Sequence, residues 1–149
     1  MQLKGLDINN TLITSIDLSS NYQLEWLEGH NCPYLEEVVY ARSGNLRSVF
    51  MDQCNFISVD ISMLPNINSY NCAYSHKLES LDFSKNEYLA VLGVAGLPLV
   101  KKLDLSNNPN IVDVDCVDCP ALDTVYLHRD AKVRRLEKPE HTIVVVADK

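Results

Sequence analysis

The sequence predicts a solenoid, in which short parallel strands stack on one another and little helix is present. Apolar residues recur at the first, fourth and sixth places of 11-residue segments, which we call arms. The arms alternate between two kinds, so two of them make a coil of 21 or 22 residues. The motif LDLSNN at 103–108 also returns as LDFSKN at 81–86 and as IDLSSN at 16–21. Internal repeats of this length are typical of stacked, quasi-one-dimensional folds.

The arms follow one another through most of the chain. Their apolar triplets are Leu3, Leu6, Ile8; Ile13, Ile16, Leu18; Leu24, Leu27, Gly29; Leu35, Val38, Tyr40; Leu46, Val49, Met51; Phe56, Val59, Ile61; Ile67, Tyr70, Cys72; Leu78, Leu81, Phe83; Leu89, Leu92, Val94; Val100, Leu103, Leu105; Ile111, Val114, Cys116; and Leu122, Val125, Leu127. Only Gly29 breaks the pattern, and from Ile13 onward the arms start 11 residues apart except for the step of 10 from Leu46 to Phe56. Side chains alternate along a strand, so we expect the fourth and sixth places to point inward and the third, fifth and seventh to face solvent.

One kind of arm carries acidic and hydroxyl residues at fixed places. Arms starting at 13, 56, 78 and 100 have Asp in the fifth place and Ser in the seventh, namely Asp17, Asp60, Asp82 and Asp104 with Ser19, Ser62, Ser84 and Ser106. We expect these side chains to bond nearby backbone groups in turns. The alternative interpretation is a ladder of carboxylates that binds cations.

The ninth place holds Asn in one kind of arm and Cys in the other. The residues are Asn21, Asn86 and Asn108, and Cys32, Cys54 and Cys119, while Cys72 and Cys116 stand in the sixth place. We expect these side chains to turn inward at the bend, where Asn bonds unpaired backbone groups and Cys is a small buried substitute. Cys32 and Cys54 are close enough in this arrangement for a disulfide, but stacked free thiols are the favoured prediction.

The pattern L-x-x-L-x-L-x-x-N, closed every 21 or 22 residues, resembles the leucine-rich-repeat family over residues 3 to about 136. The cysteines that replace Leu or Asn, together with LDLSxN in alternate arms, look most like bacterial internalin-type repeats and the related cell-surface repeat proteins of gut anaerobes. The resemblance implies a parallel sheet on one face and mostly irregular or short extended segments on the other. It also implies a secreted or surface-anchored protein without catalytic activity.

The two ends of the chain differ. Residues 1–149 are expected to form a single domain of about six coils, with 137–149 as a C-terminal cap in which TIVVVADK is the last strand. The first arm has no cap in front of it, which would leave an unpaired strand edge. We therefore expect Met1 to begin a fragment of a longer protein, and the uncapped coil to be a site of self-association.

Composition and motifs disfavour several functions. The net charge is −7 and basic residues form no run longer than two, so nucleic acid would be repelled. No stretch is apolar enough to span a membrane, and the N-terminus lacks the pattern of a signal peptide. No catalytic motif is present, and no metal or cofactor is expected. The pair in CVDC, Cys116 and Cys119, has the spacing of half a zinc site, but the repeat directs both residues inward.

Recognition is expected where the coils differ from one another, on the cysteine-bearing arms. Their outward residues include the predicted partner-binding set: Trp26, Glu28, His30, Phe50, Asp52, Asn71, Asp113 and Asp115. Trp26 and Phe50 fall on adjacent strands, and aromatic residues rimmed by polar ones are typical of binding hot spots. The alternative interpretation of Trp26 is that it shields the thin coil at Gly29.

These observations favour a non-catalytic module that binds a protein partner through the variable face. One alternative is a carbohydrate-binding module, in which Trp26 or Phe50 stacks on a sugar ring beside carboxylates. Another is a structural spacer for an upstream domain. The extracellular or cell-surface location is implied by the family resemblance alone.

Overall fold

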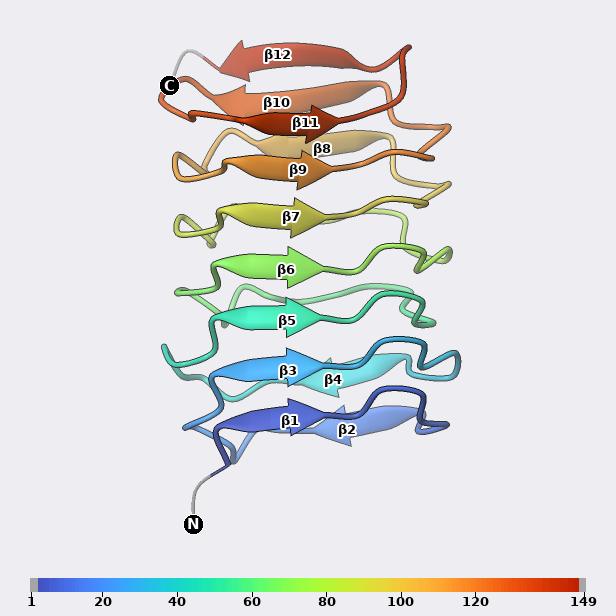
Figure 1. Cartoon of the computed structure of the whole chain (residues 1–149), viewed down its shortest axis with the longest axis vertical. Helices are drawn as coiled ribbons and strands as arrows, with labels where there is room; N and C mark the ends of the chain where they lie inside the picture. The colour runs from blue at the N-terminus through green and yellow to red at the C-terminus, as the bar shows by residue number, and fades with distance from the viewer. Residues whose placement is uncertain (1–2, 148–149) are drawn as a thin grey trace.

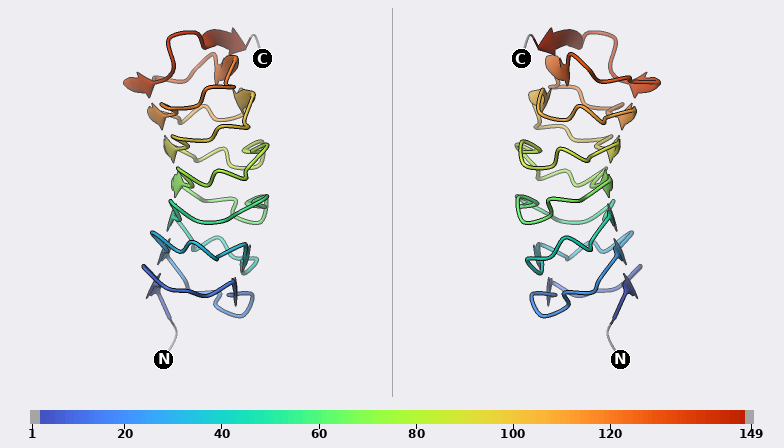
Figure 2. Two further views of the ribbon diagram at one scale, coloured as in Figure 1. Left: turned by 90° about the vertical axis from the view of Figure 1, so that its right-hand side faces the viewer. Right: turned by 90° about the vertical axis from the view of Figure 1, so that its left-hand side faces the viewer.

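The computed structural model describes residues 3–147 and has the predicted form, a solenoid of short strands (Figure 1, Figure 2). The described residues contain twelve strands and no helix. In chain order the strands are β1 (Gly5–Asp7), β2 (Ser15–Asp17), β3 (Trp26–Glu28), β4 (Glu37–Val39), β5 (Ser48–Phe50), β6 (Ser69–Asn71), β7 (Val91–Gly93), β8 (Lys102–Leu105), β9 (Asp113–Asp115), β10 (Thr124–His128), β11 (Arg135–Glu137) and β12 (Ile143–Ala147). It follows that no helix in the described part could cross a membrane.

One side of the solenoid is a continuous parallel sheet of seven strands, in the order β1-β3-β5-β6-β7-β9-β11. Successive strands pair at equivalent places of the repeat, as in Leu27 with Val49 and Val49 with Tyr70. These are the cysteine-bearing arms and their equivalents at both ends. The variable arms therefore form the regular sheet, and the recurring LDLSxN motif lies on the opposite side.

The opposite side is less regular. It contains the pair β2-β4 and the three-stranded sheet β12-β10-β8, both parallel. Between them, the arms that start at Phe56 and Leu78 run in extended form without strand pairing. Figure 1 shows these segments behind the seven-stranded sheet. One regular face and one irregular face is the arrangement that the repeat predicts.

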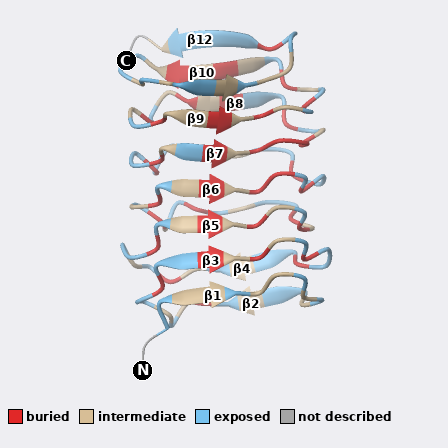
Figure 3. Ribbon diagram, in the orientation of Figure 1, coloured by how far each residue is buried: buried red, intermediate tan, exposed pale blue. Residues whose placement is uncertain are grey.

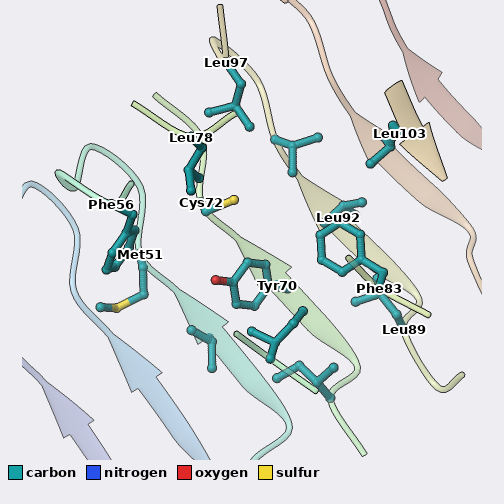
Figure 4. Packing of buried hydrophobic residues seen from close by; sticks show 14 of the residues in the cluster. Met51, Phe56, Tyr70, Cys72, Leu78, Phe83, Leu89, Leu92, Leu97 and Leu103 are labelled. Carbon is teal, nitrogen blue, oxygen red and sulfur yellow. The ribbon is translucent and has the colours of Figure 1, made fainter. Parts of the chain in front are cut away.

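The core lies between the two sides and is filled by the predicted apolar places (Figure 3). Leu27, Val49, Leu92 and Val114, all in fourth places, are fully or almost fully buried. Figure 4 shows larger side chains, such as Tyr70, packed among leucines in the middle of the stack. The inward places of the end coils, such as Leu6, are only partly buried because no further coil covers them.

Two seventh-place residues of the repeat depart from the prediction. Ala73 and Ala95, expected to face solvent, are buried with 6% and 4% of their surface exposed. The strand has already ended at this place, and the next residues, Tyr74 and Gly96, have positive φ angles of 58° and 66°. Strand alternation no longer applies there, because the backbone is turning toward the opposite side.

The Asp and Ser side chains act in turns, as expected. The Oδ1 atom of each Asp accepts a hydrogen bond from the backbone N–H two residues later, at 2.8 to 3.1 Å for Asp17, Asp60, Asp82 and Asp104. Bonding to the serines lowers the pKa of all four carboxyl groups. The recurrence of Asp in these arms is therefore explained by turn chemistry.

Two ladders of ninth-place side chains run along the solenoid, one on each side. The Nδ2 atoms of Asn86 and Asn108 donate to the sixth-place carbonyls of the preceding coils, those of Ile61 and Phe83, at 3.0 and 3.1 Å. The amide oxygens of both residues find no partner among the described residues, so each side chain acts only as a donor.

The cysteines form the second ladder in the same geometry. The Sγ atoms of Cys32, Cys54 and Cys119 donate to the carbonyls of Ile8, Gly29 and Val94, each at 3.2 Å. These carbonyls are again the sixth places of the preceding coil. Every cysteine of the chain is a buried free thiol. The structure therefore has the predicted stacked thiols.

The last strand, β12, forms as expected and pairs with β10 over five residues. Thr142 enters the core just before it, and its Oγ1 donates to the carbonyl of Leu122 at 2.7 Å. The side chains of β12 are nonetheless exposed, with 63% of Ile143 and 60% of Val146 accessible. The strand closes the backbone ladder of β10 but leaves an apolar surface on its own outer side.

Candidate functional site: the seven-stranded sheet and its turn edge

The predicted partner-binding residues all lie on the seven-stranded sheet or directly after its strands. Trp26 and Glu28 are on β3, Phe50 is on β5, Asn71 is on β6, and Asp113 and Asp115 are on β9. His30 and Asp52 follow β3 and β5 by two residues. The structure brings the residues of β3 and β5 together, because these strands pair directly. The two aspartates of β9 lie farther along, since β7 separates β9 from β6.

Trp26 lies against the strand that precedes it in the sheet. Its partner in the β1–β3 pairing is Gly5, and a Cβ atom placed on Gly5 would lie only 2.0 Å from the Trp26 indole. The indole therefore covers Gly5, while 41% of the residue remains exposed. The interpretation that Trp26 shields Gly29 is wrong, because Met51 of the next coil covers Gly29.

His30, Phe50 and Asp52 form one cluster. The Nδ1 atom of His30 is hydrogen-bonded to Oδ1 of Asp52, and its ring stacks on Phe50 with 6.4 Å between the ring centroids. The Asp52 side chain is mostly buried at 18% exposure, and that of His30 is more open at 40%. The bond and the stacking hold the imidazole in one orientation. The cluster can thus offer a fixed aromatic edge and a negative charge to a partner.

The remaining predicted residues are partly used within the protein. Oδ1 of Asn71 accepts from the N–H of Ala73 at 2.8 Å, and Oδ1 of Asp115 accepts from that of Val117 at 3.3 Å. These are the same turns that the aspartates form on the opposite side. Asp113 lies 3.3 Å from Nη1 of Arg135 on the neighbouring strand β11. This positive neighbour, which the sequence analysis did not include, weakens the acidic character of that end of the face.

A pocket of about 650 Å³ opens at the turn edge of the sheet. Asn31, Gln53, Asn55, Tyr74 and His76, from three successive coils, contribute to its lining. None of these residues belongs to the predicted set. The available signal was the step of 10 residues from Leu46 to Phe56, because the pocket lies where this arm is one residue short.

The described residues do not bring together the ligands of a metal site. Among residues 3–147, no group of three or more His, Cys, Asp and Glu side chains is placed to hold a metal ion. Cys116 and Cys119 of the CVDC motif are buried, and Sγ of Cys119 is engaged in the thiol ladder. Burial raises the pKa of Cys54 and Cys116 to about 12, so neither is an activated nucleophile.

Comparisons with known proteins detect similarity through structure only. No family model matches the chain, and no curated protein matches its sequence. The functional domain of InlJ from Listeria monocytogenes, which includes a cysteine ladder, superposes with a TM-score of 0.62 over 95% of this chain. The chain has an internalin-like leucine-rich-repeat fold. Sequence identity to this InlJ domain is 16%, and the matched region spans 40% of the length of the solved InlJ chain. The ladder of Cys32, Cys54 and Cys119 agrees with the description of the InlJ domain.

Proposed function

We propose that this internalin-like solenoid is a non-catalytic protein-binding module of a secreted or surface-anchored bacterial protein. Its binding surface is the exposed face of the seven-stranded sheet, with Trp26, His30, Phe50 and Asp52 at the centre of recognition. The observation that carries the proposal is the cluster on β3 and β5, where aromatic rings and a carboxylate are held in fixed positions. Rings that are ordered before binding lose little conformational entropy when a partner docks.

The charge of the chain favours a basic partner surface. The net charge is −7, and Glu28 and Asp52 lie beside the aromatic residues. A negative face accelerates the approach of a positive partner, and salt weakens this attraction. The resemblance to internalin-type repeats supports a surface location for this chain by analogy.

The proposal is tested by capture of host extracellular proteins on the immobilised domain. The double variant Trp26→Ala, Phe50→Ala should lose a partner that the native protein retains, by at least about a hundredfold in affinity, because hot-spot truncations cost about 2 kcal/mol or more each. The matched control is Tyr22→Ala, Tyr88→Ala, which removes two exposed aromatic rings outside the seven strands. The control variant should bind normally, and circular dichroism should show native folding for both.

Two results would overturn the proposal. If the face variant and the control bind the same proteins equally well, recognition does not use β3 and β5. If the native domain retains no protein at low or physiological salt, the spacer interpretation replaces the protein-binding proposal.

A further inference from the structure

The pocket at the turn edge arises from one missing residue. After Cys32, Ser75 and Cys119 the chain makes a tight turn closed by a bond from the N–H three residues later, at 3.0 to 3.1 Å. The arm that contains Cys54 is one residue shorter and lacks this turn. There, the N–H of Asn55 donates instead to the carbonyl of Leu35 in the preceding coil, at 3.0 Å. The pocket, which we call the notch, lies at this coil between the longer turns on either side.

Three side chains at the same place of successive coils border this notch. Asn31, Gln53 and Tyr74 have positive φ angles of 53°, 57° and 58°. Asn tolerates this conformation, whereas a bulky Tyr rarely adopts it. The equivalent residue in the next coil is Gly96, and the Tyr74 ring lies over it, 2.3 Å from the position that a Cβ atom would take. Positive φ also occurs at this place in other coils, at Asn10 and Asp118, so it belongs to the turn itself. What distinguishes Tyr74 is a bulky, partly exposed aromatic ring at a place that favours small or flexible residues, and such a residue in a pocket suggests a functional role.

The Tyr74 ring is held in a fixed position by its neighbours. It makes an edge contact with His76, with ring centroids 6.3 Å apart and planes at 78°. His76 is anchored in turn, because its Nδ1 lies 3.0 Å from the carbonyl of Gly96. These contacts fix the ring while 41% of the residue stays exposed. A flat aromatic surface of this kind suits a ligand with an apolar face.

The other side of the notch offers oriented amide groups. The Nδ2 atom of Asn31 donates to Asn10 at 2.9 Å, and that of Asn55 donates to Glu36 at 2.8 Å. Nε2 of Gln53 donates to Asp52 at 3.3 Å. Each bond fixes the plane of the amide and directs its second N–H and its carbonyl oxygen elsewhere. Hydroxyl groups, which both donate and accept, match such amides better than purely anionic or purely apolar groups do.

The charge of the pocket is balanced. The ammonium group of Lys77, which lines the pocket, lies 4.0 Å from the Glu36 carboxylate. An anion would therefore meet a positive group that is already paired, beside a protein of net charge −7. This argues for a neutral ligand.

We propose that the notch at Asn55 is a binding site for a neutral saccharide, with one sugar face stacked on Tyr74 and the hydroxyls bonded to Asn31, Gln53 and Asn55. The site adjoins the protein-binding face proposed above, because Gln53 is bonded to Asp52, but the proposal does not depend on that function. The test uses soluble neutral tetrasaccharides of glucose, mannose, galactose and N-acetylglucosamine as probes. Binding to the native protein is measured by isothermal calorimetry, with saturation-transfer NMR to detect weak contacts.

The decisive variant restores the missing residue. Insertion of a proline between Cys54 and Asn55 supplies the turn seen after Cys32 and fills the notch. It should abolish binding of the tetrasaccharide that the native protein retains. Tyr74→Asn, which keeps a residue tolerant of positive φ, should lower affinity at least about tenfold. Tyr22→Ser, which alters an exposed tyrosine outside the notch, should have no effect. Circular dichroism confirms folding, and Tyr74→Asn remains decisive if the insertion variant fails to fold.

Three outcomes would overturn the proposal. The first is that none of the four probes binds the native protein. The second is that binding survives unchanged in both the insertion variant and Tyr74→Asn. The third is that a displayed peptide library, but no sugar, is captured by the native protein and lost with the insertion, which would make the notch a peptide site.

Discussion

The Trp26 indole covers Gly5, the residue paired with it on the neighbouring strand. The same relationship holds for every glycine of the chain, because each lies against a larger side chain from an adjacent coil. The pairs are Gly5 with Trp26, Gly29 with Met51, Gly44 with Asn66, Gly93 with Asn71, and Gly96 with Tyr74. In a solenoid with a short coil spacing, a large side chain can lie across its neighbour only where that neighbour has no Cβ atom. The glycines therefore help to determine which large side chains can lie flat against the adjacent coil.

Replacement of Gly5 by alanine should displace Trp26. The added methyl group would overlap the indole, and the ring would rotate away from the sheet. We expect a loss of about 1 to 3 kcal/mol in unfolding free energy, typical of overpacking, and an emission shift to longer wavelength as the ring meets water. Trp26 is the only tryptophan, so fluorescence reports on this residue alone.

The matched control for this prediction is Gly93→Ala. There the overlapping side chain is Asn71, whose Cγ lies 2.9 Å from the added carbon position. This variant should lose stability without a change in emission wavelength. An unchanged native emission spectrum in Gly5→Ala would show that the indole does not depend on Gly5.

The repeat made the core and both sides of the solenoid predictable. A coil that stacks on identical neighbours meets the same packing problem each time, so the fourth-place residues such as Leu27 and Val49 could be placed from periodicity alone. The Asp turns and the ninth-place ladders followed for the same reason. These features depend on the spacing of residues along the chain, which can be read directly from the sequence.

The features that escaped prediction depend on interruptions of the repeat. The notch at Asn55 exists because a shortened turn changes its hydrogen-bond partner to Leu35, and the spacing alone does not reveal that choice. Ala73 is buried because the strand ends at Asn71, two residues before it, so strand alternation no longer applies. Trp26 was assigned to the wrong glycine because the direction in which a side chain leans between coils is set by three-dimensional packing.

Ser75 occupies the ninth place in the coil that follows Cys54, and its hydroxyl is buried without a partner among the described residues. By equivalence with Cys54, a side chain at this place should reach the sixth-place carbonyl of Met51. A serine side chain is shorter, because its C–O bond is shorter than a C–S bond. We expect Ser75→Cys to extend the ladder and raise the unfolding free energy by about 1 kcal/mol, measured by urea denaturation.

The control for Ser75 is Ser75→Ala, which removes the hydroxyl without adding a donor. It should slightly raise the unfolding free energy, because a buried hydroxyl without a partner costs desolvation energy and returns no hydrogen bond. If Ser75→Cys is no more stable than Ser75→Ala, the thiol ladder contributes packing rather than hydrogen bonding.

The buried thiols should make the fold sensitive to alkali. Burial raises the pKa of Cys54 and Cys116 from 9.0 to about 12, so the unfolded chain loses these protons first as the pH rises. The stability they contribute is complete below about pH 9 and is lost progressively between pH 9 and 12. The thermal midpoint should fall over this range, and the double variant Cys54→Ala, Cys116→Ala should fall less steeply. Equal slopes for the two proteins would exclude this cause.

The Asp carboxylates that bond the turns should affect stability at acidic pH. Bonds from the Ser106 side chain, and from Lys102, lower the pKa of Asp104 below 3.8, so its contribution is present above that value and is lost as the pH falls through the folded pKa. Asp104→Ala should lose about 0.5 kcal/mol at pH 7, a small value because the side chain is 42% exposed and solvent screens it. Asp104→Asn keeps an acceptor for the N–H of Ser106 and should lose less. The losses of unfolding free energy in both variants, measured by urea denaturation, should be smaller at pH 2.5 than at pH 7. A thermal shift with calcium that both variants abolish would instead favour the cation ladder over turn chemistry.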